Sequence, residues 1–259
     1  MRDVSQILIL GQTPQLWNHH SKKQSLTVRL LGKACRKVCY RSKKAGLRPT
    51  KPPANGLETE MVRPRSKSRD DLISSAMWAF WKKGFASTTV ADLVKATGVG
   101  RGGIYTDFGG KDELFLSCLA AYRQNYADPA LAVLASADDD LSGIEAYFDF
   151  FIELHKHHGM PGPGCFLANT MTELAPHDEA VREVVNKHAL ALHAGFLKAL
   201  ERSARARGTE LPASELDELA GFLATASQGL WSYGRSIHDV DELERFKSAL
   251  LKLLHKRLA

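Results

Sequence analysis

The sequence predicts an all-α fold of about nine helices, and three observations on the 259-residue chain support it. From Ser68 onward, apolar residues recur at helical spacing almost without interruption. Breaks that contain Gly, Pro or Asp separate these segments, and no segment alternates apolar and polar residues as a half-buried strand would. A composition of 44% hydrophobic and 25% charged residues is that of an ordinary water-soluble protein.

The first 62 residues form a basic segment without a clear helical or strand pattern, and they end near the proline-rich stretch RPTKPPANGLETE. Three interpretations stay open: a disordered extension, a start codon assigned upstream of a natural start at Met61, or an arm that contacts a nucleic-acid backbone. Cys35 and Cys39 lie here, and the other two cysteines are Cys118 and Cys165. None forms a C-x-x-C pair, so we expect reduced thiols and no metal.

Positive charge is concentrated in the first part of the chain. Residues 1–60 carry 12 Lys and Arg against 3 Asp and Glu, residues 61–110 carry 8 against 4, and residues 111–259 carry 15 against 22. A basic segment followed by an acidic body is typical of a nucleic-acid-binding protein. No apolar run approaches the roughly 20 residues that cross a bilayer, and no secretory signal is evident. We therefore expect a cytoplasmic protein with no membrane association.

The first helix begins after Ser68 and ends at Gly84, with one apolar face formed by Leu72, Ile73, Ala76, Met77 and Phe80. A short helix should follow from Thr89, a good N-cap, with Asp92 three residues later. Gly98 should end this helix in a left-handed conformation. The next helix should start near Gly100 and bury Ile104 and Phe108. Two short helices joined by so tight a turn form a helix-turn-helix, which the major groove of DNA accepts.

The remaining helices follow from the same periodicity. Breaks are expected at Asp138–Asp140, at Pro161–Gly164, near Pro176, around Gly208–Pro212 and near Asp239. The last two helices are expected over Ser214–Ser236 and Val240–Leu258. Their apolar faces, which include Leu230 and Trp231, are broad enough to be covered by a second copy of the chain, although packing within one chain is the alternative.

The stretch from Gly84 to Phe115 carries a more specific signal, GFASTTVADLVKATGVGRGGIYTDFGGKDELF. Its order G-F-x-x-T-T-V-x-D-L, A-x-x-G-V and G-x-x-Y-x-x-F-x-x-K-x-E-L-F resembles the DNA-binding domain of TetR/AcrR transcriptional regulators. The segment GCFLANTMTELAPHDEAV is similar to the start of the regulatory domain in some members. The resemblance implies a helix-turn-helix domain over residues 63–111 and a helical regulatory and dimerisation domain over residues 112–259. It also implies a homodimer through the last two helices that binds a palindromic operator in double-stranded DNA, and a small-molecule effector.

The resemblance also implies roles for individual residues. Thr89, Tyr105 and Lys111 match positions that contact phosphates, and Arg101 matches one that points toward base edges, with Thr106 as a second candidate. Instead of contacting phosphate, Tyr105 could be a core aromatic residue that packs on the first helix. Lys111 could likewise be a solvated lysine at the start of a helix.

The chain departs from the family pattern at the start of its recognition helix. Gly100 stands where a Ser or Thr cap is usual, and Gly102 and Gly103 leave the helix short of side chains. These glycines lower helix stability but permit close approach of the backbone to DNA. Asp107 occupies a site where an aromatic residue or His is common, and its role is open.

An effector pocket is predicted between the helices that carry Phe148, Phe151, Ile152, His155, Asn169, Trp231 and Tyr233. Ordinary core packing explains the same stripe equally well. Cys165 follows PGPG and should open a helix, whose dipole would lower the pKa of the thiol. It is either an oxidant or electrophile sensor in this pocket region or a small buried residue.

No pattern of an enzyme, a cofactor site or a metal site has supporting context, so we expect no catalytic residues and no cofactor. The leading hypothesis is a dimeric transcriptional regulator, a repressor released by a small molecule or by modification of a thiol. An effector-independent DNA-binding or architectural protein is the alternative.

Overall fold

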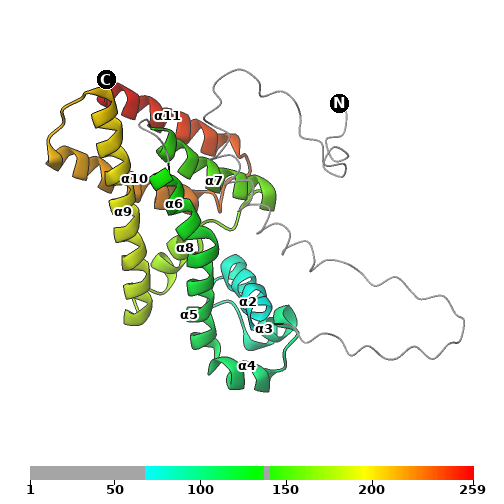
Figure 1. Ribbon diagram of the computed structural model, residues 1–259. Helices are drawn as coiled ribbons and strands as arrows, with labels where there is room; N and C mark the ends of the chain where they lie inside the picture. The colour runs from blue at the N-terminus through cyan, green and yellow to red at the C-terminus, as the bar shows by residue number, and fades with distance from the viewer. Residues whose placement is uncertain (1–67, 137–140) are drawn as a thin grey trace, which may run out of the picture.

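A computed structural model of the protein describes residues 68–136 and 141–259, and within these residues it contains helices and no strand (Figure 1). The all-α prediction is confirmed, and its count of nine helices holds if the continuous segment Lys111–Ser136 is taken as one. The elements are α2 (Arg69–Lys83), α3 (Val90–Thr97), α4 (Arg101–Phe108), α5 (Lys111–Tyr122), the π-helix η3 (Arg123–Ala127), α6 (Asp128–Ser136), α7 (Ser142–His158), α8 (Phe166–Glu173), α9 (Glu179–Arg207), α10 (Ala213–Tyr233) and α11 (Asp241–Arg257).

The N-terminal region, α2 to α4, forms one end of the molecule, and the C-terminal domain, α6 to α11, forms the rest (Figure 1). Helix α2 begins where predicted, because the Ser68 side chain accepts a hydrogen bond from the Asp71 backbone N–H at 3.2 Å. It ends at Gly84, whose φ of 84° is a conformation that glycine adopts without steric cost.

The segment Lys111–Ser136 runs from the N-terminal region into the C-terminal domain as one continuous helix with a π turn at Arg123–Ala127. Pro129 lies just after this turn and explains it, because proline has no backbone N–H to donate and its ring collides with the preceding turn of an α-helix. Widening the turn by one residue accommodates the proline without breaking the helix.

A cluster of buried aromatic side chains joins the two parts of the molecule. Trp81 from α2 packs edge-on against Tyr122 of α5 at 4.9 Å between ring centroids, and Phe115 of α5 packs against Phe166 of α8 at 5.4 Å. We call Trp81, Phe115, Tyr122 and Phe166 the junction cluster. Edge-to-face pairs of this kind add about 0.5–1.5 kcal/mol each to the stabilisation from burial. The Trp81 indole N–H also donates a buried hydrogen bond of 3.1 Å to the backbone carbonyl of Gly164.

In the C-terminal domain, α10 packs along α9 and α11 packs against α7 (Figure 1). Both last helices are shorter than predicted. α10 ends at Tyr233, because the chain turns at Gly234, and α11 spans Asp241–Arg257. The predicted breaks at Pro161–Gly164, Pro176 and Gly208–Pro212 all lie between helices.

Several predictions fall outside the described residues: the basic segment 1–62, Cys35 and Cys39, and the break at Asp138–Asp140. Among the residues that are described, none of the helices has the length and apolar character that crossing a membrane requires.

His188 of α9 makes the stability of the fold dependent on pH. Its side chain is only 4% exposed, and its Nδ1 has no hydrogen-bond partner among the described residues. Burial, with a smaller contribution from the Arg123 guanidinium, lowers the pKa of His188 from 6.5 to about 4. The unfolded chain therefore binds a proton between pH 6.5 and 4 that the folded chain does not.

We expect the free energy of unfolding to fall as the pH falls through this window, with a contribution from His188 of at most about 3 kcal/mol. Urea unfolding at pH 7 and pH 4.5 measures the difference, which the His188→Leu variant should reduce. His238→Gln, a change at an exposed histidine, is the control. An unchanged difference in His188→Leu would show that the buried imidazole does not titrate as described.

Candidate functional site

Helix α3 is held in place by a capping box at Thr89. The Thr89 hydroxyl accepts from the Asp92 backbone N–H at 3.1 Å, and the Asp92 carboxylate accepts from the Thr89 backbone N–H at 3.0 Å. The Lys83 ammonium lies 2.7 Å from the same carboxylate. Hydrogen bonds from Lys83 and from Thr89 hold the pKa of Asp92 well below its usual range. The predicted cap at Thr89 is confirmed.

This cap also bears on the predicted phosphate contact of Thr89. The Thr89 hydroxyl donates to the Asp92 carboxylate at 2.8 Å, so its only proton is already in use. The first N–H groups of α3 have no partner within the helix and point out of its positive end. A phosphate at this position would therefore be bound by backbone N–H groups, with Thr89 orienting the helix.

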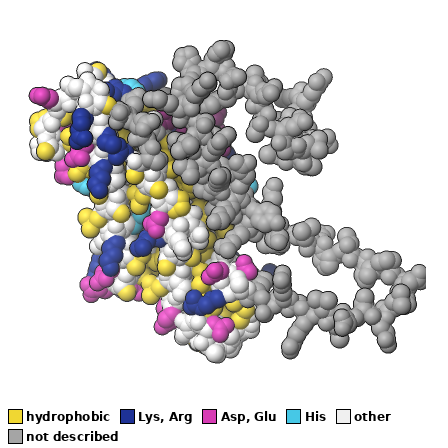
Figure 2. Space-filling view, in the orientation of Figure 1, with side chains coloured by type: hydrophobic (Ala, Val, Ile, Leu, Met, Phe, Trp, Pro, Cys, Tyr) yellow, Lys and Arg dark blue, Asp and Glu magenta, His cyan; other side chains and the backbone are white. Residues whose placement is uncertain are grey.

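Helix α4 presents a surface with few side chains. Gly98 ends α3 with a left-handed φ of 75°, as predicted, and Gly100 precedes α4 without a side-chain cap. Ile104 and Phe108 are buried beneath the helix. The outward face carries the exposed residues Arg101, Gly102, Tyr105, Thr106 and Asp107. In Figure 2 this tip of the molecule is largely white, the colour of backbone and uncharged polar side chains.

Tyr105 and Lys111 each had two possible roles. Tyr105 is 51% exposed, so the alternative of a core aromatic residue is wrong, and its phenol is available to a ligand. The Lys111 ammonium lies 4.1 Å from the centroid of the Phe85 ring, so Lys111 is not simply solvated. This cation–π contact holds the ammonium beside the start of α5. The phosphate contacts predicted for Tyr105 and Lys111 stay predictions.

The two glycines inside α4 differ in their surroundings. A Cβ at Gly103 would lie 2.4 Å from Cγ1 of Val99, so packing against the turn requires glycine there. A Cβ at Gly102 would meet no atom within 4 Å. The fold itself therefore gives no steric reason for glycine at Gly102, which is exposed on the face that carries Arg101 and Tyr105.

The predicted effector residues lie together in the C-terminal domain but pack tightly. Ring centroids of Phe151 and Trp231 are 4.8 Å apart, and His155 stacks on Trp231 at 5.8 Å. Phe148 and Ile152 are fully buried beside them. Tyr233 was wrongly placed in this group: it is 49% exposed and donates to Glu242 at 2.7 Å, because α10 ends there and the chain turns outward.

Two polar atoms inside this aromatic core have no hydrogen-bond partner among the described residues. They are Nε2 of His155 and Nε1 of Trp231. Burial lowers the pKa of His155, whose Nδ1 lies 2.8 Å from the Phe151 carbonyl oxygen. Asn169 lies at the edge of the core and donates to the Pro163 carbonyl at 2.9 Å. Buried polar groups usually find a partner, so these two atoms mark where a polar group of a ligand could be recognised.

Cys165 precedes α8 as predicted, but the expectation of a lowered thiol pKa is wrong. The side chain is 1% exposed, and the Tyr122 hydroxyl donates to its Sγ at 3.4 Å. Burial raises the pKa of the Cys165 thiol and outweighs the opposing effect of Tyr122 and of the backbone N–H groups of α8. The thiol is a buried component of the core between α5 and α8.

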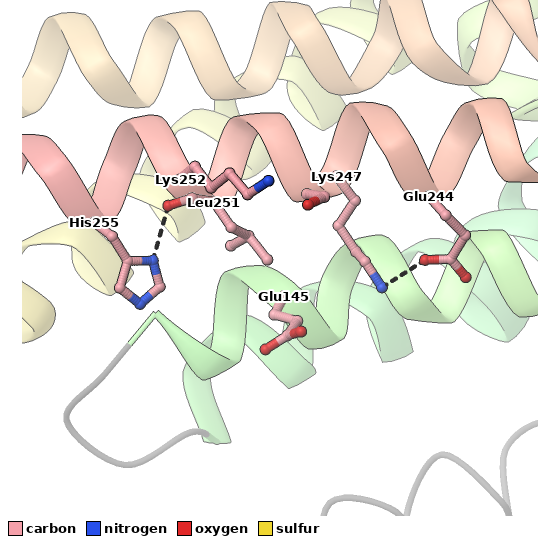
Figure 3. Close-up of a pocket in the computed structure, with 7 residues that line it drawn as sticks. Glu145, Glu244, Lys247, Leu251, Lys252 and His255 are labelled. Atoms are coloured by element: carbon pink, nitrogen blue, oxygen red, sulfur yellow. Dashed lines mark hydrogen bonds and ion pairs between the residues drawn. The ribbon is translucent and has the colours of Figure 1, made fainter.

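The sequence did not reveal an open pocket of about 570 Å³ between α7 and α11 (Figure 3). Helix α7 contributes Glu145 to its walls, and α11 contributes charged, polar and apolar side chains: Glu244, Lys247, Ser248, Leu251, Lys252 and His255. Lys247 is paired with Glu244 at 2.8 Å and also with Asp149. From the sequence alone these residues look like the solvated faces of two helices. Among the described residues, no group of three or more His, Cys, Asp or Glu is arranged to hold a metal ion.

We expect Gly102→Ala to stabilise the protein by up to about 1 kcal/mol, because alanine is the better helix former and the site is open. The same change should weaken DNA binding by placing a methyl group on the face that carries Arg101. Gly103→Ala is the matched control within the helix, and its clash with Val99 should lower the melting temperature. Thermal unfolding and a DNA titration of both variants check this. A Gly102→Ala protein with unchanged DNA affinity would contradict the role given to this face.

Comparison with known proteins is consistent with this geometry. A profile described as "Bacterial regulatory proteins, tetR family" matches residues 72–118, and one described as "Tetracyclin repressor-like, C-terminal domain" matches residues 141–250. The HTH-type transcriptional repressor ComR of Escherichia coli (strain K12) is 29% identical over 192 residues, which cover 74% of this chain and 90% of ComR. The repressor BdcR of the same organism is 25% identical over 181 residues, 70% of this chain and 86% of BdcR.

Solved structures agree. A cysteine mutant of the TetR family regulator CifR, complexed with 26-bp double-stranded operator DNA, is 25% identical with a TM-score of 0.62, over 73% of this chain and 98% of CifR. A TetR regulator from Chloroflexus aurantiacus J-10-FL shares the fold at 24% identity and a TM-score of 0.62, over 72% and 93% of the two chains. The chain therefore belongs to the TetR family of bacterial regulatory proteins, which are helix-turn-helix transcriptional regulators.

Proposed function

We propose that the protein is a dimeric repressor that binds a palindromic operator and is released from it by a small, largely apolar effector. The observation that carries the proposal is the division of the molecule into two ends. Helix α4, with its exposed face, lies at one end, and α10, which carries the buried Trp231, lies in the other part, as the placing of the two helices in Figure 1 shows. Named repressors among the relatives, and operator DNA bound to CifR, support it.

A dimer through α10 and α11 fits the side chains that these helices leave exposed. Phe222 of α10 is 53% exposed and Leu253 of α11 is 63% exposed. Large apolar side chains on neighbouring helices favour burial against a second copy. A two-fold dimer presents two recognition helices to two half-sites, which is why its operator should be palindromic. Such a protein acts where the bacterial chromosome is, in the cytoplasm.

Within this proposal, the side chains of α4 and α5 have separate tasks. Arg101 is exposed at the first position of α4, where its guanidinium can reach a guanine edge in the major groove. Tyr105, Lys111 and the amides at the start of α3 would contact phosphates and so set the register of the protein on the DNA. Thr106 is a second candidate for base contact. Recognition therefore depends on few side chains, with Gly102 allowing close approach.

The effector is proposed to enter the aromatic core, where it would satisfy the Nε2 atom of His155 and the Nε1 atom of Trp231. Apolar walls with a few polar groups suit a small hydrophobic molecule that carries an acceptor or donor. Because the core is closely packed, binding must favour a second arrangement of the helices. Different affinities in the two arrangements would release the DNA.

To test the proposal, the DNA that flanks the coding region is searched for a palindrome. The fragment that contains it is then used in a gel shift. The full-length protein should bind this fragment with nanomolar affinity, and a panel of small apolar compounds should include one that releases it. Binding that is equal for random duplexes, strongly dependent on salt and insensitive to every compound would instead indicate an effector-independent architectural protein.

We expect Arg101→Ala to reduce discrimination between the palindrome and a random duplex by about 10- to 100-fold, because one bidentate base contact contributes about 1–3 kcal/mol. Lys111→Ala should weaken binding to both duplexes equally and lower the salt slope by about one. Fluorescence anisotropy titrations at several salt concentrations measure both effects. Equal loss of discrimination in the two variants would contradict this division of tasks.

Release by modification of a thiol is disfavoured by the burial of Cys165. We expect iodoacetamide at neutral pH to leave Cys165 and Cys118 unmodified in the folded protein, since both thiols are buried and burial raises the pKa of each. Mass spectrometry of the native and the urea-unfolded protein measures the modification. Rapid native alkylation of Cys165, accompanied by loss of DNA binding, would restore the sensor hypothesis.

A further inference from the structure

The turn between α2 and α3 is held by a carboxylate from the other part of the molecule. Glu173, the last residue of α8, accepts the Ala86 backbone N–H on Oε1 at 2.8 Å and the Phe85 backbone N–H on Oε2 at 3.1 Å. Both carboxylate oxygens are thus used on two consecutive amides. Hydrogen bonds to an ionised acceptor are about twice as strong as neutral ones.

The close approach of this carboxylate depends on Gly84. A Cβ at Gly84 would lie 2.9 Å from Oε2 and 3.0 Å from Oε1 of Glu173, so no larger residue fits without displacing it. Gly84 also has a φ of 84°, which turns the chain out of α2 and exposes the next two amides to Glu173. The contact is thus built from both sides, by a glycine in the turn and by an acid 89 residues further along the sequence.

The turn that Glu173 holds leads directly into the helix-turn-helix. The Thr88 hydroxyl donates to the Gly84 carbonyl at 2.6 Å, and the Thr88 N–H donates to the Phe85 carbonyl at 3.1 Å. Residue 89 is the cap of α3. Few free torsions therefore separate the amides bound by Glu173 from the start of α3, and a displacement of the carboxylate displaces α3 with it.

Phe85 extends the contact to a predicted phosphate-binding side chain. Its ring packs on Phe115 at 4.9 Å and carries the Lys111 ammonium at 4.1 Å on its face. Glu173 therefore fixes the backbone of the residue whose side chain positions Lys111. At the other end of α8, Gly164 accepts the Trp81 indole N–H. Helix α8 and the loop just before it thus contact the N-terminal region through hydrogen bonds, one set at each end of the helix.

We propose that Glu173 is a positioning residue for operator binding: its carboxylate sets the orientation of the helix-turn-helix on the C-terminal domain, and so the spacing of the two recognition helices in a dimer. This inference rests on the proposed function. Glu173 touches no DNA. It acts through the Phe85 and Ala86 amides, and its loss should relax the required half-site spacing without removing any contact to DNA.

The test uses the full-length Glu173→Gln variant, which keeps the shape of the side chain but replaces one acceptor oxygen with an NH₂ donor that faces a backbone N–H. Glu201→Gln is the control, because it makes the same change of charge at an exposed residue of α9 with no ion pair among the described residues. Three measurements are made: amide hydrogen exchange without DNA, thermal unfolding, and binding to duplexes with the palindrome at its natural spacing or with one base pair inserted between the half-sites.

In Glu173→Gln we expect exchange of the Phe85 and Ala86 amides to accelerate about tenfold, more than that of most α2 amides, and the melting temperature to fall by only a few degrees, about 3–6 °C. Affinity for the natural palindrome should fall about tenfold, and the inserted duplex should be bound almost as well as the natural one. Glu201→Gln should match the unaltered protein in every measurement.

Two results would overturn the inference: unchanged exchange at Phe85 and Ala86, or an equal loss of affinity on both duplexes with the spacing preference kept. If the unaltered protein itself fails to prefer the palindrome, the proposed function is wrong, and the exchange measurement still decides whether Glu173 holds the turn.

Discussion

The burial of Trp81 is the constraint on which the arrangement of this protein depends. The indole ring belongs to α2, yet it is fully buried and packs on Tyr122 and Phe166, while its N–H reaches the Gly164 carbonyl. A buried indole N–H without a partner would be unfavourable by about 1–3 kcal/mol. The loop before α8 must therefore keep Gly164 at this place, which fixes where α8 begins and where Glu173 meets the turn after α2.

This junction connects the aromatic core around Trp231 with the N-terminal region, as the proposed release by an effector requires. Gly164 lies against the Trp231 carbonyl and the Asn169 side chain, and Gly162 donates a backbone hydrogen bond to Gly234. The same short loop thus contacts the aromatic core on one side and Trp81 on the other. A ligand that separates Trp231 from this loop would move α8, and α8 holds α2 and the turn after it. The route consists of hydrogen bonds and packed rings, which have discrete arrangements.

In the surface proposed to bind DNA, glycines lower the stability of helix α4 but allow close approach of the DNA. Gly103 is required by its contact with Val99, whereas Gly102 occupies open space. Glycine inside a helix lowers stability, so the N-terminal region must be stabilised elsewhere. The capping box of Thr89 and Asp92, the ion pair of Asp92 with Lys83 and the junction cluster provide that stabilisation. Helix α4 can then remain poor in side chains and close to a ligand.

The sequence by itself determined what depends on neighbouring residues: the helical fold, the cap at Thr89, the left-handed Gly98 and the burial of Ile104 and Phe108. Helix periodicity and capping act over a few residues, so they can be read locally. Only the tertiary structure decided the exposure of Tyr105, the outward position of Tyr233, the raised pKa of Cys165 and the contact of Glu173 with Phe85 and Ala86. Each of these depends on whether distant parts of the chain pack against the side chain or leave it in solvent, and no local pattern records that.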